Sequence, residues 1–299
     1  MDVQFMNKGG RKMKVDNAII LAAGTASRFA PISYEKPKAL IEVKGEVLIE
    51  RQIRQLREAG IQQIIVVTGY KAEQFSYLAE QFDVLLVHNP DYLTRNNHSS
   101  LYEVRKYLKN SYICSSDNYF LGNPFEGDID EAYYASVYVE GKTDEWCIYD
   151  ENDWIKDVVV GGEDSWIMLG HVFFTETFSK KFLDILISEY DLEETKDKLW
   201  ESIYIEHIDA LPMKIRKYSR DFIFEFDTLD ELRLFDSKYL KDTGSVILKA
   251  CAKKLGVLEE QLTTIQAFKD KNNEAAGFTF KARNHQYKYD YKTHVLEEI

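Results

Sequence analysis

The sequence is poor in cysteine and has no long apolar run, and each absence excludes a class of protein. Its three cysteines, Cys114, Cys147 and Cys251, are scattered without the Cys-x-x-Cys spacing of zinc and redox sites. We therefore expect buried thiols, with no disulfide and no zinc centre. No stretch reaches the roughly 18 apolar residues of a membrane span. Residues 1–14 are polar and basic without the apolar centre of a signal peptide, so we predict a flexible leader there and a cytoplasmic protein.

Basic side chains are also outnumbered. The 299-residue chain has 50 Asp and Glu against 38 Lys and Arg, a formal net charge of −12. Such a charge disfavours phosphate backbones and anionic lipids, so we expect neither nucleic acid nor a membrane as partner. The 45% hydrophobic and 29% charged residues are typical of an ordinary globular protein. Local cations, helped by a divalent metal ion, must then attract any phosphorylated ligand.

Residues 18–41 carry the most informative pattern. A short apolar run at 18–21 predicts a buried parallel strand, and a loop of small residues follows it. Ligands bind at the carboxyl end of parallel strands, and small residues let backbone N–H groups approach a polyphosphate. The loop lacks both the G-K-[ST] ending and the three-glycine spacing of the common phosphate-binding loops. The expected nucleotide-binding residues are Leu21, Ala22, Ala23, Gly24 and Thr25.

Two basic residues, Arg28 and Lys38, follow this loop. Pro37 fixes the backbone just before Lys38 and forces Lys36 into an extended conformation. The plainer alternative is a strand and turn with unrelated surface cations. The whole pattern, L-A-A-G-x-x-x-R and then K-P-K-A-L, resembles the nucleoside-diphosphate-sugar pyrophosphorylase-like nucleotidyltransferases. The resemblance implies that Arg28 and Lys38 are catalytic and neutralise charge on the phosphates.

The rest of the chain predicts an α/β fold. Strands alternate with amphipathic helices up to residue 90, the pattern of a parallel sheet with right-handed crossovers. Shorter aromatic strands at 133–174 predict an antiparallel extension on the substrate side. We therefore expect a Rossmann-like, mostly parallel twisted sheet with helices on both faces. Helices are predicted at 48–59, 72–82, 177–189 and 198–208, and strands at 64–67, 84–87, 214–218 and 222–226.

Two distant carboxylates are candidate ligands of Mg²⁺. Asp117 ends an apolar strand and would lie at the same sheet edge as the small-residue loop, although an aspartate that only caps a turn is the alternative. Residues 225–232 match the E-x-D-[ST]-x-x-D-L pattern of the same family. The resemblance implies that Asp227 is the second metal ligand, with Glu225 as an alternative or assistant, and Thr228 is expected to cap the following helix.

A polar loop at 94–101 is a further candidate. In the plainer interpretation it only begins a helix, because Ser100 and Glu103 fit a capping box. The family has an N-N-x-x-S-L segment along the nucleotide at this place, and the resemblance extends to Asn96, Asn97 and Ser100. Amide and hydroxyl groups are what reading a pyrimidine edge requires.

The second half of the chain indicates the acceptor. T-D-E-W at 143–146 and L-W-E at 199–201 resemble two segments of the bacterial CTP:phosphocholine cytidylyltransferases, with the same motif order between residues 15 and 240. The resemblance implies CTP and phosphocholine as substrates. A quaternary ammonium donates no N–H hydrogen bond, so aromatic faces and a carboxylate bind it. The candidate acceptor residues are Trp146, Trp200, Glu201 and Tyr119, with Trp154 and Trp166 unranked.

Several alternatives stay open. Leu199 stands where an aromatic residue would strengthen the box, and a primary ammonium, as in phosphoethanolamine or 2-aminoethylphosphonate, would prefer carboxylates to rings. A sugar 1-phosphate is another possible acceptor. A catalytically silent nucleotide sensor would keep the fold without turnover. These residues do not distinguish CTP from UTP.

We expect a nucleotidyltransferase domain at 15–240 and a small appendage at 241–299. Residues 244–255 predict a helix that Gly256 ends, and 278–291 predict a β-hairpin that turns at Arg283 and Asn284. The appendage faintly resembles the opening strands of a choline-kinase-like lobe, but no H-x-D or D-F-G segment follows, so kinase activity is not expected. It either docks on the main domain or pairs two chains into a homodimer.

Replacement of Lys38 tests the catalytic assignment. We expect Lys38→Ala to lower turnover by about 10² to 10³ with the fold intact, the typical loss for one group that stabilises a transition state. Steady-state pyrophosphate release measures the effect, and circular dichroism checks the fold. A folded variant with near-normal turnover would remove Lys38 from the site.

Overall fold

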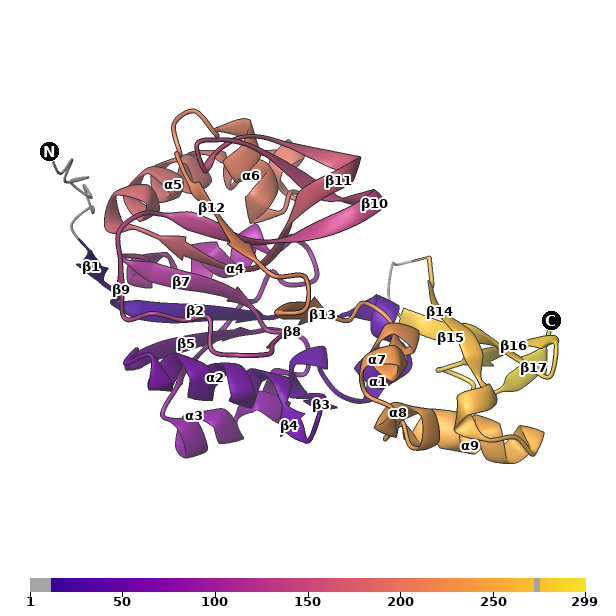
Figure 1. The fold of residues 1–299 in the computed structure, drawn as a ribbon. Coiled ribbons are helices and arrows are strands. Elements are labelled where there is room, and N and C mark those ends of the chain that lie inside the picture. The colour runs from indigo at the N-terminus through magenta and orange to yellow at the C-terminus, as the bar shows by residue number, and fades with distance from the viewer. Residues whose placement is uncertain (1–11, 272–274) are drawn as a thin grey trace, which may run out of the picture. The chain divides into compact units, whose positions relative to one another are not determined.

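The computed structural model describes residues 12–271 and 275–299 and divides into two compact units (Figure 1). Unit 1 consists of the residues up to Gly24 together with Gln52–Phe224, and unit 2 consists of Thr25–Arg51 together with Glu225–Ile299. The flexible leader was expected at residues 1–14, of which residues 1–11 lie outside the described part, whereas its last two residues belong to a strand. Met13–Lys14 form β1, which pairs with β9 (Asp128–Ile129). The contacts thus group residues 25–51 with the C-terminal part of the chain, whereas the division at residue 240 stays a prediction.

A seven-stranded sheet forms the centre of unit 1. Its strands are β2 (Asn17–Ala22), β5 (Gln63–Thr68), β6 (Leu85–His88), β7 (Ser111–Ser115), β10 (Tyr133–Glu151), β11 (Trp154–Phe174) and β12 (Lys214–Tyr218). They follow the order β10-β12-β11-β7-β2-β5-β6. β2 pairs in parallel with β5 and β7, and β5 pairs in parallel with β6. The expected mostly parallel sheet is therefore confirmed.

Helices cover both faces of this sheet, as expected. Figure 1 shows α5 and α6 on one side and α2 and α3 on the other. Ile19, Ile113 and Phe174 of the sheet share a buried core with Phe182 of α5 and Ile203 of α6. The helices are α2 (Leu48–Glu58), α3 (Tyr77–Phe82), α4 (His98–Glu103), α5 (Glu176–Glu189) and α6 (Trp200–Glu206), with short 3₁₀ turns at Ala72–Phe75, Arg105–Tyr107 and Glu193–Thr195.

The antiparallel extension is confirmed, but it consists of two long strands, where shorter strands were expected. β10 and β11 pair with each other antiparallel, with several register shifts. Asn152 and Asp153 form the turn between them, with φ of 52° and 63°, a conformation that suits the twist of a tight hairpin. A smaller pair, β8 (Asn118–Phe120) with β13 (Ile223–Glu225), completes the strands of unit 1.

Unit 2 contains the helix and hairpin expected near the C-terminus. Gly256 ends α9 at a φ of 63°, and Arg283 and Asn284 form the turn between β15 and β16 with φ of 49° and 68°. The sequence did not reveal β14 and β17, which widen the hairpin to a four-stranded sheet. These elements are α9 (Val246–Leu255), β14 (Thr263–Lys269), β15 (Ala275–Ala282), β16 (His285–Asp290) and β17 (Leu296–Glu298).

The other elements of unit 2 are short. They are α1 (Ile32–Glu35), α7 (Leu229–Phe235), α8 (Lys238–Lys241), the strand pair β3 (Glu42–Val43) and β4 (Glu46–Val47), and 3₁₀ turns at Ser27–Phe29, Lys38–Leu40 and Glu259–Gln261. Lys36 is extended, as Pro37 requires. Thr228 caps α7 through its side chain, as expected. The capping box at Ser100 is wrong, because α4 begins two residues earlier and Ser100 lies inside it.

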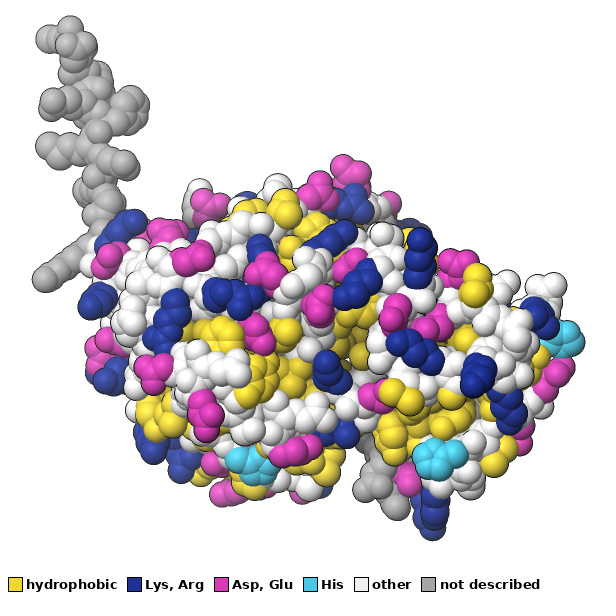
Figure 2. Space-filling model, turned by 90° about the horizontal axis from the view of Figure 1, so that it is seen from below, with side chains coloured by type: hydrophobic (Ala, Val, Ile, Leu, Met, Phe, Trp, Pro, Cys, Tyr) yellow, Lys and Arg dark blue, Asp and Glu magenta, His cyan; other side chains and the backbone are white. Residues whose placement is uncertain are grey.

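Surface and thiol properties agree with the composition. Cys114, Cys147 and Cys251 are buried and unpaired with one another. Within the described residues, no helix has the length and apolar character to cross a bilayer. On the face drawn in Figure 2, lysine and arginine side chains are interspersed with aspartate and glutamate.

Candidate active site

The carboxyl ends of β2, β5 and β7 meet at one edge of the unit 1 sheet. Leu21 pairs with Ser115, and Ala22 pairs with Thr68. The loops that follow these strands therefore leave the sheet side by side. Asp117 is half-buried in the turn between β7 and β8, two residues beyond Ser115. The register thus brings Asp117 to the same edge as the small-residue loop, as the sequence predicted.

A backbone contact holds the small-residue loop in place. The Tyr70 amide donates a hydrogen bond of 3.0 Å to the carbonyl of Ala23. This approach requires glycine at position 69, because a Cβ there would lie 2.8 Å from the Ala23 oxygen and 2.7 Å from Tyr92. Gly24 is exposed, and no described atom lies within 4 Å of the place that a Cβ would take. Gly24 therefore presents bare backbone to its surroundings, a feature that suits phosphate binding, whereas Ala22 and Ala23 are buried.

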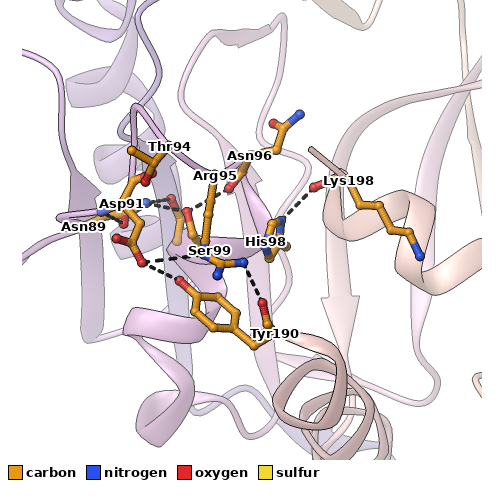
Figure 3. A network of polar contacts seen from close by, with 10 residues as sticks. Asn89, Asp91, Thr94, Arg95, Asn96, His98, Ser99, Tyr190 and Lys198 are labelled. Atoms are coloured by element: carbon orange, nitrogen blue, oxygen red, sulfur yellow. Dashed lines mark hydrogen bonds and ion pairs between the residues drawn. The ribbon is translucent and has the colours of Figure 1, made fainter. Parts of the chain in front are cut away.

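Loop 89–99 is bound firmly to the segment that precedes α6 (Figure 3). Arg95 donates to the Tyr190 carbonyl over 2.5 Å, and its guanidinium lies 4.3 Å from the centre of the Tyr190 ring. The Tyr190 hydroxyl donates in turn to Asp91 over 2.7 Å. His98 Nδ1 lies 2.7 Å from the Lys198 carbonyl oxygen, so this nitrogen carries the proton. Burial lowers the pKa of His98, which keeps the ring neutral.

This network brings Asn97 to Trp200 and Glu201, over a hundred positions later in the chain. The Asn97 side chain accepts a hydrogen bond from the Trp200 amide at 2.7 Å and donates one to the Glu201 carboxylate at 3.1 Å. The Tyr134 hydroxyl also bonds this carboxylate. Burial raises the pKa of Glu201 to about 7, against the opposing effect of these two hydrogen bonds and of a third from the backbone amide of Glu201 itself. Glu201 is thus a carboxylate whose charge depends on what binds beside it.

Sequence reasoning missed Tyr134. Its ring stacks on that of Trp200 with centroids 6.0 Å apart and planes 16° from parallel. Nothing in the local sequence distinguishes Tyr134 from the many other tyrosines of the chain, because its partners come from α6. Trp200 is 2% exposed and packs in the hydrophobic core, whereas Trp146 is half-buried against the same core. Trp146 therefore offers the more accessible indole.

The other expected ligand-binding side chains lie in the same unit. Asn96 donates to the Asp197 carbonyl over 3.0 Å, so its amide helps to fix the loop. Ser100 is buried, and its hydroxyl accepts a hydrogen bond of 3.1 Å from Asn89. Tyr119 is buried in β8. Their roles toward a ligand stay predictions.

Three of the expected residues converge within unit 2. Arg28 Nη1 lies 2.9 Å from Asp227 Oδ2, and Lys38 Nζ lies 3.8 Å from Asp227 Oδ1. The Lys38 side chain is 8% exposed and that of Arg28 is 74% exposed. Solvent therefore screens the Arg28 pair, while the Lys38 amine is held inside the protein near the Phe29 ring. Thr25 belongs to this unit as well.

The donor chemistry of the two aspartates suits a hard divalent cation. Carboxylate oxygens are the protein ligands that Mg²⁺ prefers, and it keeps the rest of its shell for water and phosphate. Asp117 lies in unit 1 and Asp227 in unit 2. Each is described within its own unit, and their joint action on one metal ion stays a prediction.

Comparison with known proteins identifies the family of this chain. Residues 18–122 match the MobA-like NTP transferase domain family. The choline-phosphate cytidylyltransferase of Streptococcus pneumoniae is 36% identical over 217 residues, which are 72% of this chain and 95% of that protein. The 2-aminoethylphosphonate cytidylyltransferase of Lancefieldella rimae is 33% identical over 77% of this chain and 96% of its own length.

A solved structure gives the same answer for the fold. The CTP:phosphocholine cytidylyltransferase from Streptococcus pneumoniae matches with a TM-score of 0.72 and 35% identity, over 76% of this chain and 99% of that one. Sequence and structure thus agree over nearly the full length of that enzyme. The chain therefore belongs to the bacterial cytidylyltransferase family and is a nucleotidyltransferase.

Proposed function

We propose that this chain transfers the cytidylyl group of CTP to phosphocholine, producing CDP-choline and pyrophosphate. The observation that carries the proposal is the Glu201 carboxylate, which Asn97 and Tyr134 hold by hydrogen bonds, with the Tyr134 ring stacked on that of Trp200. A carboxylate that is poorly solvated gains from a cation that needs no hydrogen bond, and aromatic rings nearby add to that attraction. The relation to the pneumococcal choline-phosphate cytidylyltransferase supports the same acceptor.

The reaction needs no protein nucleophile. A phosphate oxygen of the acceptor attacks the α-phosphorus of CTP in line, the bond to the bridging oxygen breaks, and pyrophosphate leaves with the electron pair. Lys38 and Arg28 neutralise negative charge on the phosphate oxygens as it develops. The backbone of residues 21–25 positions the triphosphate. Catalysis in this proposal is positioning together with electrostatic stabilisation.

Mg²⁺ is the cofactor that we propose, with Asp117 and Asp227 as its protein ligands. Bound there, the ion would act as a Lewis acid toward phosphate oxygens. Two of its proposed neighbours, Arg28 and Lys38, already contact Asp227. That carboxylate therefore serves in orienting the cations as well.

We assign the acceptor-binding roles by the solvent accessibility of the side chains. Glu201 supplies the charge and the half-buried Trp146 the more accessible indole, while Trp200 and Tyr134 support the carboxylate from the core. Tyr119, Asn96 and Ser100 remain proposed ligand contacts. We also propose a cytoplasmic location without a nucleic acid partner, and the homodimer stays a prediction.

2-Aminoethylphosphonate is a second candidate acceptor. The Lancefieldella rimae relative is named for this compound and is 33% identical over 77% of the chain. Its primary ammonium would donate hydrogen bonds to Glu201, which a choline group does not do. The two acceptors therefore differ in how far they depend on hydrogen bonds and on rings.

A matrix of nucleotides and acceptors tests the proposed function. The purified full chain is assayed for pyrophosphate release with CTP or UTP against phosphocholine, phosphoethanolamine, 2-aminoethylphosphonate and glucose 1-phosphate. We expect the highest kcat/KM for CTP with phosphocholine. A preference for another acceptor would reassign the substrate, and tight CTP binding without turnover on any acceptor would favour a nucleotide sensor.

Inhibition by choline tests the proposed role of Glu201 in binding the acceptor. Choline carries a permanent positive charge and no group that titrates in this pH range, so any pH dependence comes from the protein. With a pKa of about 7, Glu201 becomes ionised between pH 6 and 8. We expect the inhibition constant of choline to fall roughly tenfold over this range, in step with the ionised fraction. Glu201→Gln should bind choline weakly and without this pH dependence. An unchanged pH profile in the variant would contradict the assignment.

Glu201 should also make stability depend on pH. Its pKa is raised from the ordinary 4.5 to about 7, so between these values the folded state holds a proton that the unfolded state has released. The contribution to the free energy of unfolding is complete below pH 4.5 and is lost as the pH rises through 7. Urea unfolding should show wild type losing stability relative to Glu201→Gln over this range, while the exposed control Glu194→Gln follows wild type.

A further inference from the structure

The chain is longer than the solved relative that it matches. The pneumococcal structure is matched over 99% of its length by 76% of this chain, and the family motifs end near residue 240. The C-terminal residues belong to the same compact unit as residues 25–51, which contain Arg28 and Lys38. Contacts within unit 2 show what the C-terminal segment 242–299 does there.

Glu35 ties this segment to the neighbourhood of Lys38. Its carboxylate accepts a hydrogen bond from the Ser245 hydroxyl. It also accepts hydrogen bonds from the backbone amides of Val246 at 2.8 Å and Ile247 at 3.3 Å. Ser245 itself caps the Leu248 amide at 3.0 Å. The free N–H groups at the start of α9 are thus satisfied by a carboxylate from α1, which the helix dipole also favours.

A second contact joins α1 to the C-terminal sheet. The rings of Tyr34 and Tyr291 stack with centroids 3.7 Å apart and planes 11° from parallel. Tyr291 also lies 6.0 Å from Phe278 in the core of the four-stranded sheet. Because Lys36 is extended and Pro37 is rigid, the two residues between Glu35 and Lys38 transmit the position of α1 to the Lys38 backbone.

Asp227, the partner of Lys38 and Arg28, is also held in place through contacts with segment 242–299. Thr228, next to Asp227, caps α7, and Arg233 of this helix is 5% exposed. The Arg233 guanidinium donates to the carbonyl oxygens of Leu262 at 2.6 Å and Glu259 at 2.9 Å. A buried guanidinium with several carbonyl partners is costly to move. Both members of the Lys38–Asp227 pair are therefore anchored on residues 242–299.

We propose that residues 242–299 position residues 36–43, the Lys38 segment, for the transfer reaction, with Glu35 as the positioning residue. Glu35 acts through the backbone of Lys38 and is not assigned a contact with substrate. The proposal rests on the proposed function for the role of Lys38. It predicts that loss of the Glu35 contacts loosens residues 36–43 and slows turnover more than it weakens nucleotide binding.

Two variants break the contact from opposite sides. Glu35→Ala removes the acceptor. Val246→Pro removes one donor at a helix position that tolerates proline, and the extended Ser245 before it is compatible with that change. Glu35→Gln keeps an oxygen acceptor and should restore part of the effect. Glu297→Gln, which alters the Lys288–Glu297 pair of the same sheet, is the matched control.

The experiment compares hydrogen exchange of residues 36–43 with steady-state kinetics in the full chain. We expect Glu35→Ala to speed exchange there and to lower kcat on the order of tenfold with little change in KM for CTP, since small misplacements of a catalytic group are costly. Val246→Pro should act in the same direction more weakly, and the control should match wild type.

Two results would overturn the proposed role of Glu35, and a third would overturn the proposed cytidylyl transfer alone. Unchanged exchange in both Glu35→Ala and Val246→Pro would overturn it, as would faster exchange with unchanged kcat. If wild type transfers no cytidylyl group to any acceptor, the proposed function fails. The exchange data would still decide whether Glu35 holds the Lys38 segment.

Discussion

The parallel pairing of β2 between β5 and β7 is the constraint on which the unit 1 site depends. In a parallel sheet, strands that run side by side end at the same edge, so their loops are neighbours without any further interaction. Leu21 opposite Ser115 and Ala22 opposite Thr68 place the small-residue loop and the Asp117 turn there. Gly69 is then required for a steric reason, because the Ala23 carbonyl and the Tyr92 side chain leave no room for a Cβ.

The acceptor side depends on a different kind of order. One backbone hydrogen bond, from the Asn96 amide to the Lys196 carbonyl at 3.0 Å, joins loop 89–99 to the segment before α6. Side chains that bond backbone carbonyls, as those of Arg95 and His98 do, add to this attachment. These bonds bring Asn97 to Glu201, whose poorly solvated carboxylate accepts hydrogen bonds from Asn97, from Tyr134 and from its own backbone amide. The cost of that burial raises the proton affinity of Glu201, and a bound cation would offset it. The preference for a cationic acceptor that we propose rests on this packing.

In unit 2, the positively charged side chains of Arg28 and Lys38 are attached to a well-anchored backbone. Lys38 and Arg28 both contact Asp227, and the burial of Lys38 makes its amine the better organised of the two cations. Backbone rigidity around it has two sources, the extended Lys36-Pro37 segment and the attachment of α1 to α9 through Glu35. A segment beyond the family motifs therefore takes part in ordering residues within them. This carboxylate-to-helix contact, together with the hydrogen bonds of Lys238 and Tyr239 to Glu42, joins residues 25–51 to the C-terminal part of the chain.

The sequence alone determined the elements whose cause is local. Small residues after an apolar run, proline before Lys38 and threonine before α7 each act within a few residues, so the parallel strands, the extended Lys36 and the Thr228 cap could be predicted. The family motifs likewise singled out Lys38, Arg28 and Asp227. Only the tertiary structure decided that Tyr134 supports Glu201, that Trp200 is core while Trp146 is more accessible, that Ser100 is buried, and that Glu35 caps α9. Those outcomes depend on residues that are distant in the chain and on the solvent they exclude, and no local pattern encodes either.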